Sequence, residues 1–182
     1  MCNLFDKNIL IIISQNQFCE QELCGVRDVF MERGARVVVL SKSGQEALGA
    51  NKERFQPDGM IVDWNKKIGI ENKYHAVILV GGKGAKKSLW DDPIVPQILT
   101  DHYRFGSVIG AMGAAIVVLV RASLVTGEVP IPEDDATYKE LENLNAVCVD
   151  VPITRVENVV LGQGGNSVHQ FSQKIIDLIE MK

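Results

Sequence analysis

The sequence NILIIIS, residues Asn8–Ser14, is a continuous apolar run that is rich in β-branched side chains. Such a run is typical of a strand that is buried on both faces, as occurs in parallel sheets covered by helices. Two further runs have the same character, RVVVL at Arg36–Leu40 and YHAVILV at Tyr74–Val80. Together these runs predict the strands of a parallel sheet.

Amphipathic segments separate these runs. Apolar residues recur at helical spacing and predict a helix over Glu20–Arg33, which Gly34 is expected to end. These residues are Leu23, Val26, Val29 and Phe30. The same reasoning predicts strands at Gly59–Val62, Ser107–Met112, Ala146–Asp150 and Val156–Leu161, and helices within Lys86–Tyr103, at Gly113–Ala122 and at Ser167–Met181. Strands that alternate with helices at this spacing predict an α/β fold, a doubly wound, mostly parallel sheet between helices of the flavodoxin-like kind.

Composition limits the function classes. The chain has 182 residues, 46% hydrophobic and 23% charged, which is ordinary for one globular domain over residues 1–182. A net charge of −4 leaves no basic excess for a phosphate backbone, so no nucleic-acid partner is expected. No apolar run is long enough to span a membrane, and the N-terminal run lacks the pattern of a signal peptide. The acidic stretch before Ala136 is expected to cap a helix rather than to divide two domains.

The cysteines and histidines do not suggest a metal site or a disulfide framework. The four cysteines form no CxxC pair and no zinc spacing, so they are expected to be reduced thiols of a cytoplasmic protein. The three histidines are too few for a metal cluster and are expected to be structural or on the surface. Neither a metal nor a cofactor is therefore expected. These residues are Cys2, Cys19, Cys24 and Cys148, and His75, His102 and His169.

Ligands of doubly wound folds bind beyond the carboxyl ends of the strands, so the loops at this edge of the sheet are the expected binding site. After Val80 the chain continues GGKGAKKS, but Lys86 and Lys87 stand where the P-loop and the dinucleotide-binding pattern require glycine. Two interpretations remain, a tight turn with solvated lysines, or a turn with Gly81 and Gly82 whose free N–H groups favour an anion.

A second loop of interest is IGAMGAA at residues 109–115, where a strand turns into a helix through small residues. Such a bend can present a nucleophile at a helix N-terminus, but no side chain here can attack a substrate. The bend is either an anion site or a place of close helix–strand packing. Glu22 lies near the same edge of the sheet and either acts in the site or stabilises the first turn of its helix. Cys19 lies in the loop before it, and Cys24 follows it.

The order of these segments resembles the ThiJ/PfpI superfamily. YHAVILVGG at residues 74–82 is similar to the family's YDALVLPGG, and IGAMGAA is similar to IAAICxxP. ASLVTG at residues 122–127 resembles AGLLxG, GQGGNS at residues 162–167 resembles RGPGTS, and FCEQEL at residues 18–23 resembles the first loop with its glutamate. The resemblance covers Asn8 to Glu180. It implies a three-layer sandwich like that of class I glutamine amidotransferases, and a homodimer.

The departures from the family pattern bear on function. Counted back from Gly127, the family's nucleophilic cysteine falls on Gly113 and the histidine that follows it in one branch falls on Ala114. The other register, with the cysteine on Ala111, spoils the ASLVTG match. Only Glu22 matches the family's acidic partner. Glycine adopts the strained conformation of the family's cysteine without a Cβ clash, so Gly113 keeps the shape of the bend and removes the thiol.

These observations favour a non-catalytic member of the superfamily, a dimeric protein that binds a small carbonyl or carboxylate compound or has a regulatory role. The expected pocket residues are Glu22, Cys19, Gly81, Gly82, Gly113 and Ala114, with N–H groups of Gly82 and Ala114 facing the ligand oxygen. The alternative is a hydrolase- or glyoxalase-like enzyme in which Cys19 supplies the thiol or Glu22 acts as general base on water. A redox- or stress-linked, chaperone-like protein is a third hypothesis, which rests on the resemblance alone.

Overall fold

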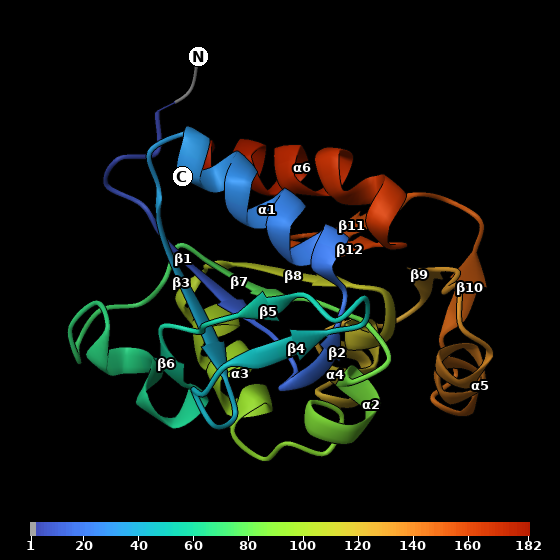
Figure 1. Ribbon diagram of the computed structural model, residues 1–182. Helices are drawn as coiled ribbons and strands as arrows, with labels where there is room; N and C mark the ends of the chain where they lie inside the picture. The colour runs from blue at the N-terminus through green and yellow to red at the C-terminus, as the bar shows by residue number, and fades with distance from the viewer. Residues whose placement is uncertain (1–2) are drawn as a thin grey trace.

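The computed structural model describes residues 3–182, so Cys2 lies outside the described residues. The central sheet has seven strands in the order β11-β12-β8-β7-β1-β3-β6 (Figure 1). All neighbouring pairs are parallel except β11 and β12, which are antiparallel. The predicted doubly wound α/β fold is confirmed. The strands are β1 (Asn8–Ile12), β3 (Arg36–Ser41), β6 (Gly59–Met60), β7 (Ala76–Leu79), β8 (Val108–Met112), β11 (Ile153–Val156) and β12 (Val159–Gly162).

Helices cover both faces of this sheet. On one face α1 (Glu20–Glu32) and α6 (Val168–Glu180) lie side by side (Figure 1). On the other face lie α2 (Ala85–Ser88), α3 (Val95–Phe105) and α4 (Ile116–Arg121). No helix of residues 3–182 combines the length and the apolar character that a membrane crossing needs.

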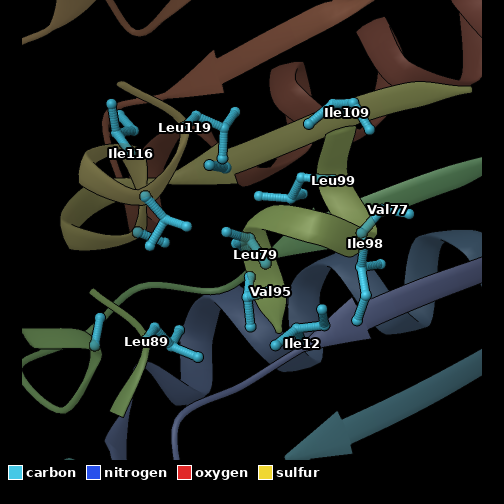
Figure 2. Packing of buried hydrophobic residues seen from close by; sticks show 14 of the residues in the cluster. Ile12, Val77, Leu79, Leu89, Val95, Ile98, Leu99, Ile109, Ile116 and Leu119 are labelled. Carbon is cyan, nitrogen blue, oxygen red and sulfur yellow. The ribbon is translucent and has the colours of Figure 1, made fainter. Parts of the chain in front are cut away.

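The pleat of β1 explains why its sequence is apolar at every position. Ile9 and Ile11 belong to the core under α1 and α6, whereas Leu10 and Ile12 belong to the core under α3 and α4. Successive side chains of a strand point to opposite faces, so a strand between two helical layers needs apolar residues throughout. In Figure 2, Ile12 lies close to Val95 of α3 within the second of these cores.

The later part of the chain corrects two expectations. Val156–Leu161 is not one strand, because the chain reverses between β11 and β12 at Glu157, whose φ is +52°. The strand expected at Ala146–Asp150 exists as β10 (Val147–Val149), but it pairs with β9 (Glu128–Pro130) outside the central sheet. The acidic stretch caps α5 (Asp135–Asn143) as expected, since the Asp134 carboxylate accepts the amide hydrogens of Ala136 and Thr137.

Short elements complete the chain. The strand expected at Gly59–Val62 ends at Met60 and continues as a 3-10 helix, and the helix expected at Gly113–Ala122 begins with a 3-10 turn. A second sheet of three strands, which the sequence did not predict, has the order β2-β4-β5. The additional elements are β2 (Asn16–Phe18), β4 (Ala47–Gly49), β5 (Arg54–Phe55) and the 3-10 helices Ile61–Lys66, Gly113–Ala115 and Gly165–Ser167.

Candidate functional site

A pocket of about 430 Å³ lies at the carboxyl edge of the central sheet. Its walls come from the start of α1, from the loops after β4, β7, β8 and β12, and from the segment before α5. Five of the six residues expected at the site line it, and the sixth, Gly81, contacts Glu22 directly behind the wall. The lining residues are Cys19, Glu20, Gln21, Glu22, Ala50, Asn51, Gly82, Lys83, Gly113, Ala114, Pro132, Glu133, Asp134, Gln163 and Gly164.

Glu22 is the buried acid of this pocket. Its side chain is only 4% exposed, and its Oε2 accepts the Gly81 amide hydrogen at 2.7 Å. Burial raises the pKa of Glu22 to about 7, and the negative charge of Glu133 adds to the rise, whereas the bond from Gly81 opposes it. Near neutral pH both the carboxylic acid and the carboxylate are therefore populated, so the group can donate or accept a proton.

Gly113 lies at the bend after β8, opposite this acid. Its φ is +54°, a conformation that costs energy for residues with a Cβ atom. A Cβ atom built there would lie 3.4 Å from Glu22 Oε1 and 3.8 Å from the Gln163 carbonyl oxygen, which are ordinary contacts. The space for a side chain is thus open, and a side chain placed there would start beside the Glu22 carboxyl group.

Gly82 brings the loop after β7 close to the start of α1. Its φ is +111°, and a Cβ atom there would lie 2.5 Å from the Gln17 carbonyl oxygen and 2.6 Å from the Cys19 nitrogen. Only glycine permits this approach. Among residues 3–182, the amides of Gly82 and Ala114 donate to no other protein group. Two backbone donors of the pocket are therefore free for a ligand.

The cysteines differ in their positions. Cys19 is half-buried at the pocket wall, and burial together with the charge of Glu22 raises the pKa of its thiol to about 11, although the N–H groups of Gln21 and Glu22 act in the opposite direction. At neutral pH this thiol is protonated, which is the poorly nucleophilic form. Cys24 is exposed on α1 and Cys148 lies in β10, and neither lines the pocket.

Other wall residues were not expected from the sequence. Glu20 is 6% exposed and accepts the Asn51 amide hydrogen at 2.6 Å, which holds the loop after β4 against α1. Glu133 and Asp134 complete the wall, where the sequence indicated only a helix cap. With Glu22, these groups place four carboxyl side chains around the pocket, against the single ammonium of Lys83.

The remaining expectations concern metals and histidines. No group of three or more His, Cys, Asp and Glu side chains within the described part of the chain is arranged to hold a metal ion. His102 is completely buried and its Nδ1 lies 2.7 Å from the Ile98 carbonyl oxygen, which is a structural role. His169 is exposed on α6, and His75 is half-buried beside β1.

Comparisons with known proteins identify relatives over nearly the whole chain. The sequence profile of the DJ-1/PfpI family matches residues 7–178. An uncharacterized protein of Methanocaldococcus jannaschii is 26% identical over 98% of this chain and 85% of its own length. A glutathione-independent glyoxalase of Caenorhabditis elegans is 26% identical over 96% of this chain and 89% of its own. The crystal structure of a ThiJ/PfpI domain protein from Brachyspira murdochii superposes with a TM-score of 0.84 at 20% identity, covering 96% of this chain and 97% of the other.

Proposed function

This chain belongs to the DJ-1/PfpI family, and we propose that it binds a small neutral carbonyl compound at the carboxyl edge of its sheet without thiol catalysis. The observation that carries the proposal is the backbone of Gly113. The positive φ and the open space beside Glu22 suit a bend that presents a side chain to this acid. With glycine there, the bend supplies an amide-lined cavity but no nucleophile.

The charge of the pocket selects the ligand class. A carboxylate ligand would meet four carboxyl side chains and one ammonium, which is unfavourable at close range. A carbonyl oxygen carries no net charge and can accept hydrogen bonds from the free amides of Gly82 and Ala114. The protonated form of Glu22 offers a further donor, because its pKa is about 7. Of the two ligand classes expected from the sequence, the carbonyl class is the better match.

Cys19 does not replace the missing nucleophile in this proposal. Its pKa is raised to about 11, so the reactive thiolate is scarce at neutral pH. Activated cysteines lie in electropositive surroundings, whereas the charges of Glu22 and Glu20, which both follow Cys19 along the chain, raise the pKa of its thiol.

Thermal unfolding with and without small ligands tests the binding proposal. A ligand at 100 times its Kd stabilises the folded protein by about 2.7 kcal/mol, which raises the Tm of a chain of this size by about 5–11 °C. We expect hydroxyacetone or a related neutral carbonyl compound to raise the Tm, and lactate at equal concentration not to do so. A shift by lactate alone, or no shift with a panel of small carbonyl compounds, would contradict the proposal.

The variant Glu22→Gln separates the role of the acid from that of the amides. Parent binding should weaken as pH rises through about 7, because the ionised carboxylate can no longer donate to the carbonyl oxygen. The glutamine amide donates at every pH, so binding by the variant should be independent of pH. Glu32→Gln, at an exposed position of the same helix, is the matched control and should behave like the parent.

A second candidate function has one specific observation in its favour. A carboxyl group with a pKa of about 7 is suited to proton transfer at neutral pH. Ionised Glu22 would take a proton from a water molecule while the water oxygen bonds to the carbonyl carbon of an aldehyde. The resulting oxyanion, held by the amides of Gly82 and Ala114, would then receive that proton from Glu22. The product of this step is the aldehyde hydrate, so faster hydration of a small aldehyde with the parent, lost in Glu22→Gln, would establish this function. Binding of the aldehyde without faster hydration would mean that binding is the only function of the site.

We also propose that the chain forms a homodimer, as the family resemblance implies. Light scattering coupled to gel filtration measures this directly. A solution mass near the monomer mass of 20.1 kDa at micromolar concentration would contradict it.

A further inference from the structure

A second pocket lies at the opposite, amino edge of the central sheet and plays no part in the proposed function. Its volume is about 260 Å³. Segments that immediately precede β1, β7 and β8 form its floor, and the ends of α3 and α6 form its sides. The lining residues are Lys7, Lys73, Tyr74, His75, Phe105, Gly106, Ser107, Ile179 and Lys182.

The charge of this pocket is of one sign. Three lysines line it, and no carboxylate side chain does. Among residues 3–182, none of these lysines forms an ion pair. The chain as a whole carries a net charge of −4, so a small pocket whose charged side chains are all lysines differs from the rest of the chain.

Two of the ammonium groups have defined neighbours. The Lys182 ammonium lies above Gly106, 4.0 Å from the position of an ideal Cβ atom there, so no side chain separates it from this wall. The Lys73 ammonium lies 4.8 Å from the centroid of the Trp64 ring, which is not a lining residue, so this charge stands beside the pocket rather than in it. Burial lowers the pKa of Lys182, a direction that a bound anion would reverse.

His75 adds a directional donor to these charges. Its Nδ1 accepts the Asn8 amide hydrogen at 3.0 Å, so the neutral ring carries its proton on Nε2. Burial and the nearby charge of Lys7 lower the pKa of His75, which favours the neutral ring. The neutral ring thus has a free N–H on Nε2, and His75 is one of the residues that line the pocket.

We propose that this amino-edge pocket binds a small phosphate-bearing anion, with Lys7 and Lys182 supplying the positive charge and His75 a hydrogen bond. A phosphate monoester presents three acceptor oxygens and close to two negative charges, which suits several ammonium donors around one centre. The volume is below the range of pockets for drug-sized ligands, so the occupant is small. The apolar side chains of Ile179 and Phe105, the latter 68% exposed, can contact a short organic part.

Isothermal titration with inorganic phosphate and with glycerol 3-phosphate, at constant ionic strength set by sodium chloride, tests the proposal. We expect saturable binding with a stoichiometry of one per chain. Tighter binding of the ester would identify an organic phosphate as the ligand, and equal binding would identify the free ion. An absence of saturable heat for both probes would overturn the proposal.

Four variants locate the binding. Lys7→Ala and Lys182→Ala should each weaken phosphate binding at least tenfold, and His75→Asn, which keeps an acceptor near Asn8 but removes the ring donor, should weaken it several-fold. Lys139→Ala, an exposed lysine on α5, is the matched control and should bind like the parent. If the control loses as much affinity as the pocket variants, the binding is a general effect of charge and the proposal fails.

The lysines also lie near the carboxyl ends of α3 and α6, where positive charge stabilises a helix. If this were their whole role, the lysine variants would have lower Tm values but unchanged phosphate affinity, which would refute the site. Circular dichroism of each variant verifies that it is folded before titration. Glu22→Gln should leave phosphate binding unchanged. A failure of the phosphate proposal can therefore be distinguished from a failure of the carbonyl-binding proposal.

Discussion

Replacement of Glu22 by glutamine should make the protein more stable at alkaline pH. The carboxyl group has an ordinary pKa of 4.5 and a pKa of about 7 in the folded protein. Because the folded state holds the proton more tightly than the unfolded state, the stability from this group is fully present below pH 4.5 and is lost as pH rises to about 7. Above that pH the folded state must keep a buried carboxylate.

The magnitude follows from the difference between the two pKa values. At about 1.4 kcal/mol for each pH unit, the parent loses about 3 kcal/mol of folding free energy between pH 4.5 and pH 7 through this group alone. The variant has no ionisable group at this position, and its amide oxygen can still accept the Gly81 hydrogen. At pH 8 we therefore expect Glu22→Gln to exceed the parent in stability by up to about 3 kcal/mol, or about 6–12 °C in Tm.

Urea unfolding of both proteins at half-unit intervals from pH 4.5 to pH 8 measures this difference. The other titrating groups are common to both chains, so they cancel in the comparison. Glu32→Gln, which is exposed, should give a curve parallel to that of the parent. If the parent and Glu22→Gln curves also run parallel over this range, Glu22 does not titrate there, and the argument for a proton donor in the pocket is refuted.

Three further predictions concern backbone strain, thiol reactivity and helix capping. Gly113→Ala and its control Gly127→Ala, both at positive φ without a close contact, should each lose about 1–2 kcal/mol, but only Gly113→Ala should alter carbonyl binding; an unchanged Tm for Gly113→Ala would contradict its positive φ. In alkylation at pH 8 followed by mass spectrometry, exposed Cys24 should react well before Cys19, whose pKa is about 11, and rapid labelling of Cys19 near neutral pH would instead favour a relocated nucleophile. Asp134→Ala should cost about 1 kcal/mol in thermal unfolding through loss of the α5 cap, and no loss would show that its two amide contacts are not formed in solution.

The central strands were predictable because burial on both faces leaves a strong signal. Asn8–Ser14 and Tyr74–Val80 contain no alternation of polar residues, and both lie inside the sheet. The reversal at Glu157 left a weaker signal, since the positive φ is held by a glutamate and only Asn158, the next residue, is of a type that favours turns. The sheet of β2, β4 and β5 was missed because its strands are only two or three residues long.

The residues of the candidate site were likewise predictable only in part. Glu22, Gly82 and Gly113 were predictable because they follow strand ends, which meet at one edge of a parallel sheet. Glu20 and Asn51 were not, because their contact joins two positions 31 residues apart, one at the start of α1 and the other in the turn after β4. No local pattern reports such a contact, and the acidic character of the wall therefore became visible only in the folded chain.

The place of β1 in the middle of the sheet has a consequence for the nascent chain. This strand leaves the ribosome first, yet one of its two neighbours is β7, and Asn8 contacts His75 at a separation of 67 residues. At a synthesis rate of about 5–20 residues per second, the partner follows about 3–13 seconds later. During that interval the five-residue strand β1 lacks β7, one of the two strands with which it pairs. Four residues that are buried in the finished protein are thus exposed until β7 has been made, which makes this strand a natural binding site for a ribosome-associated chaperone.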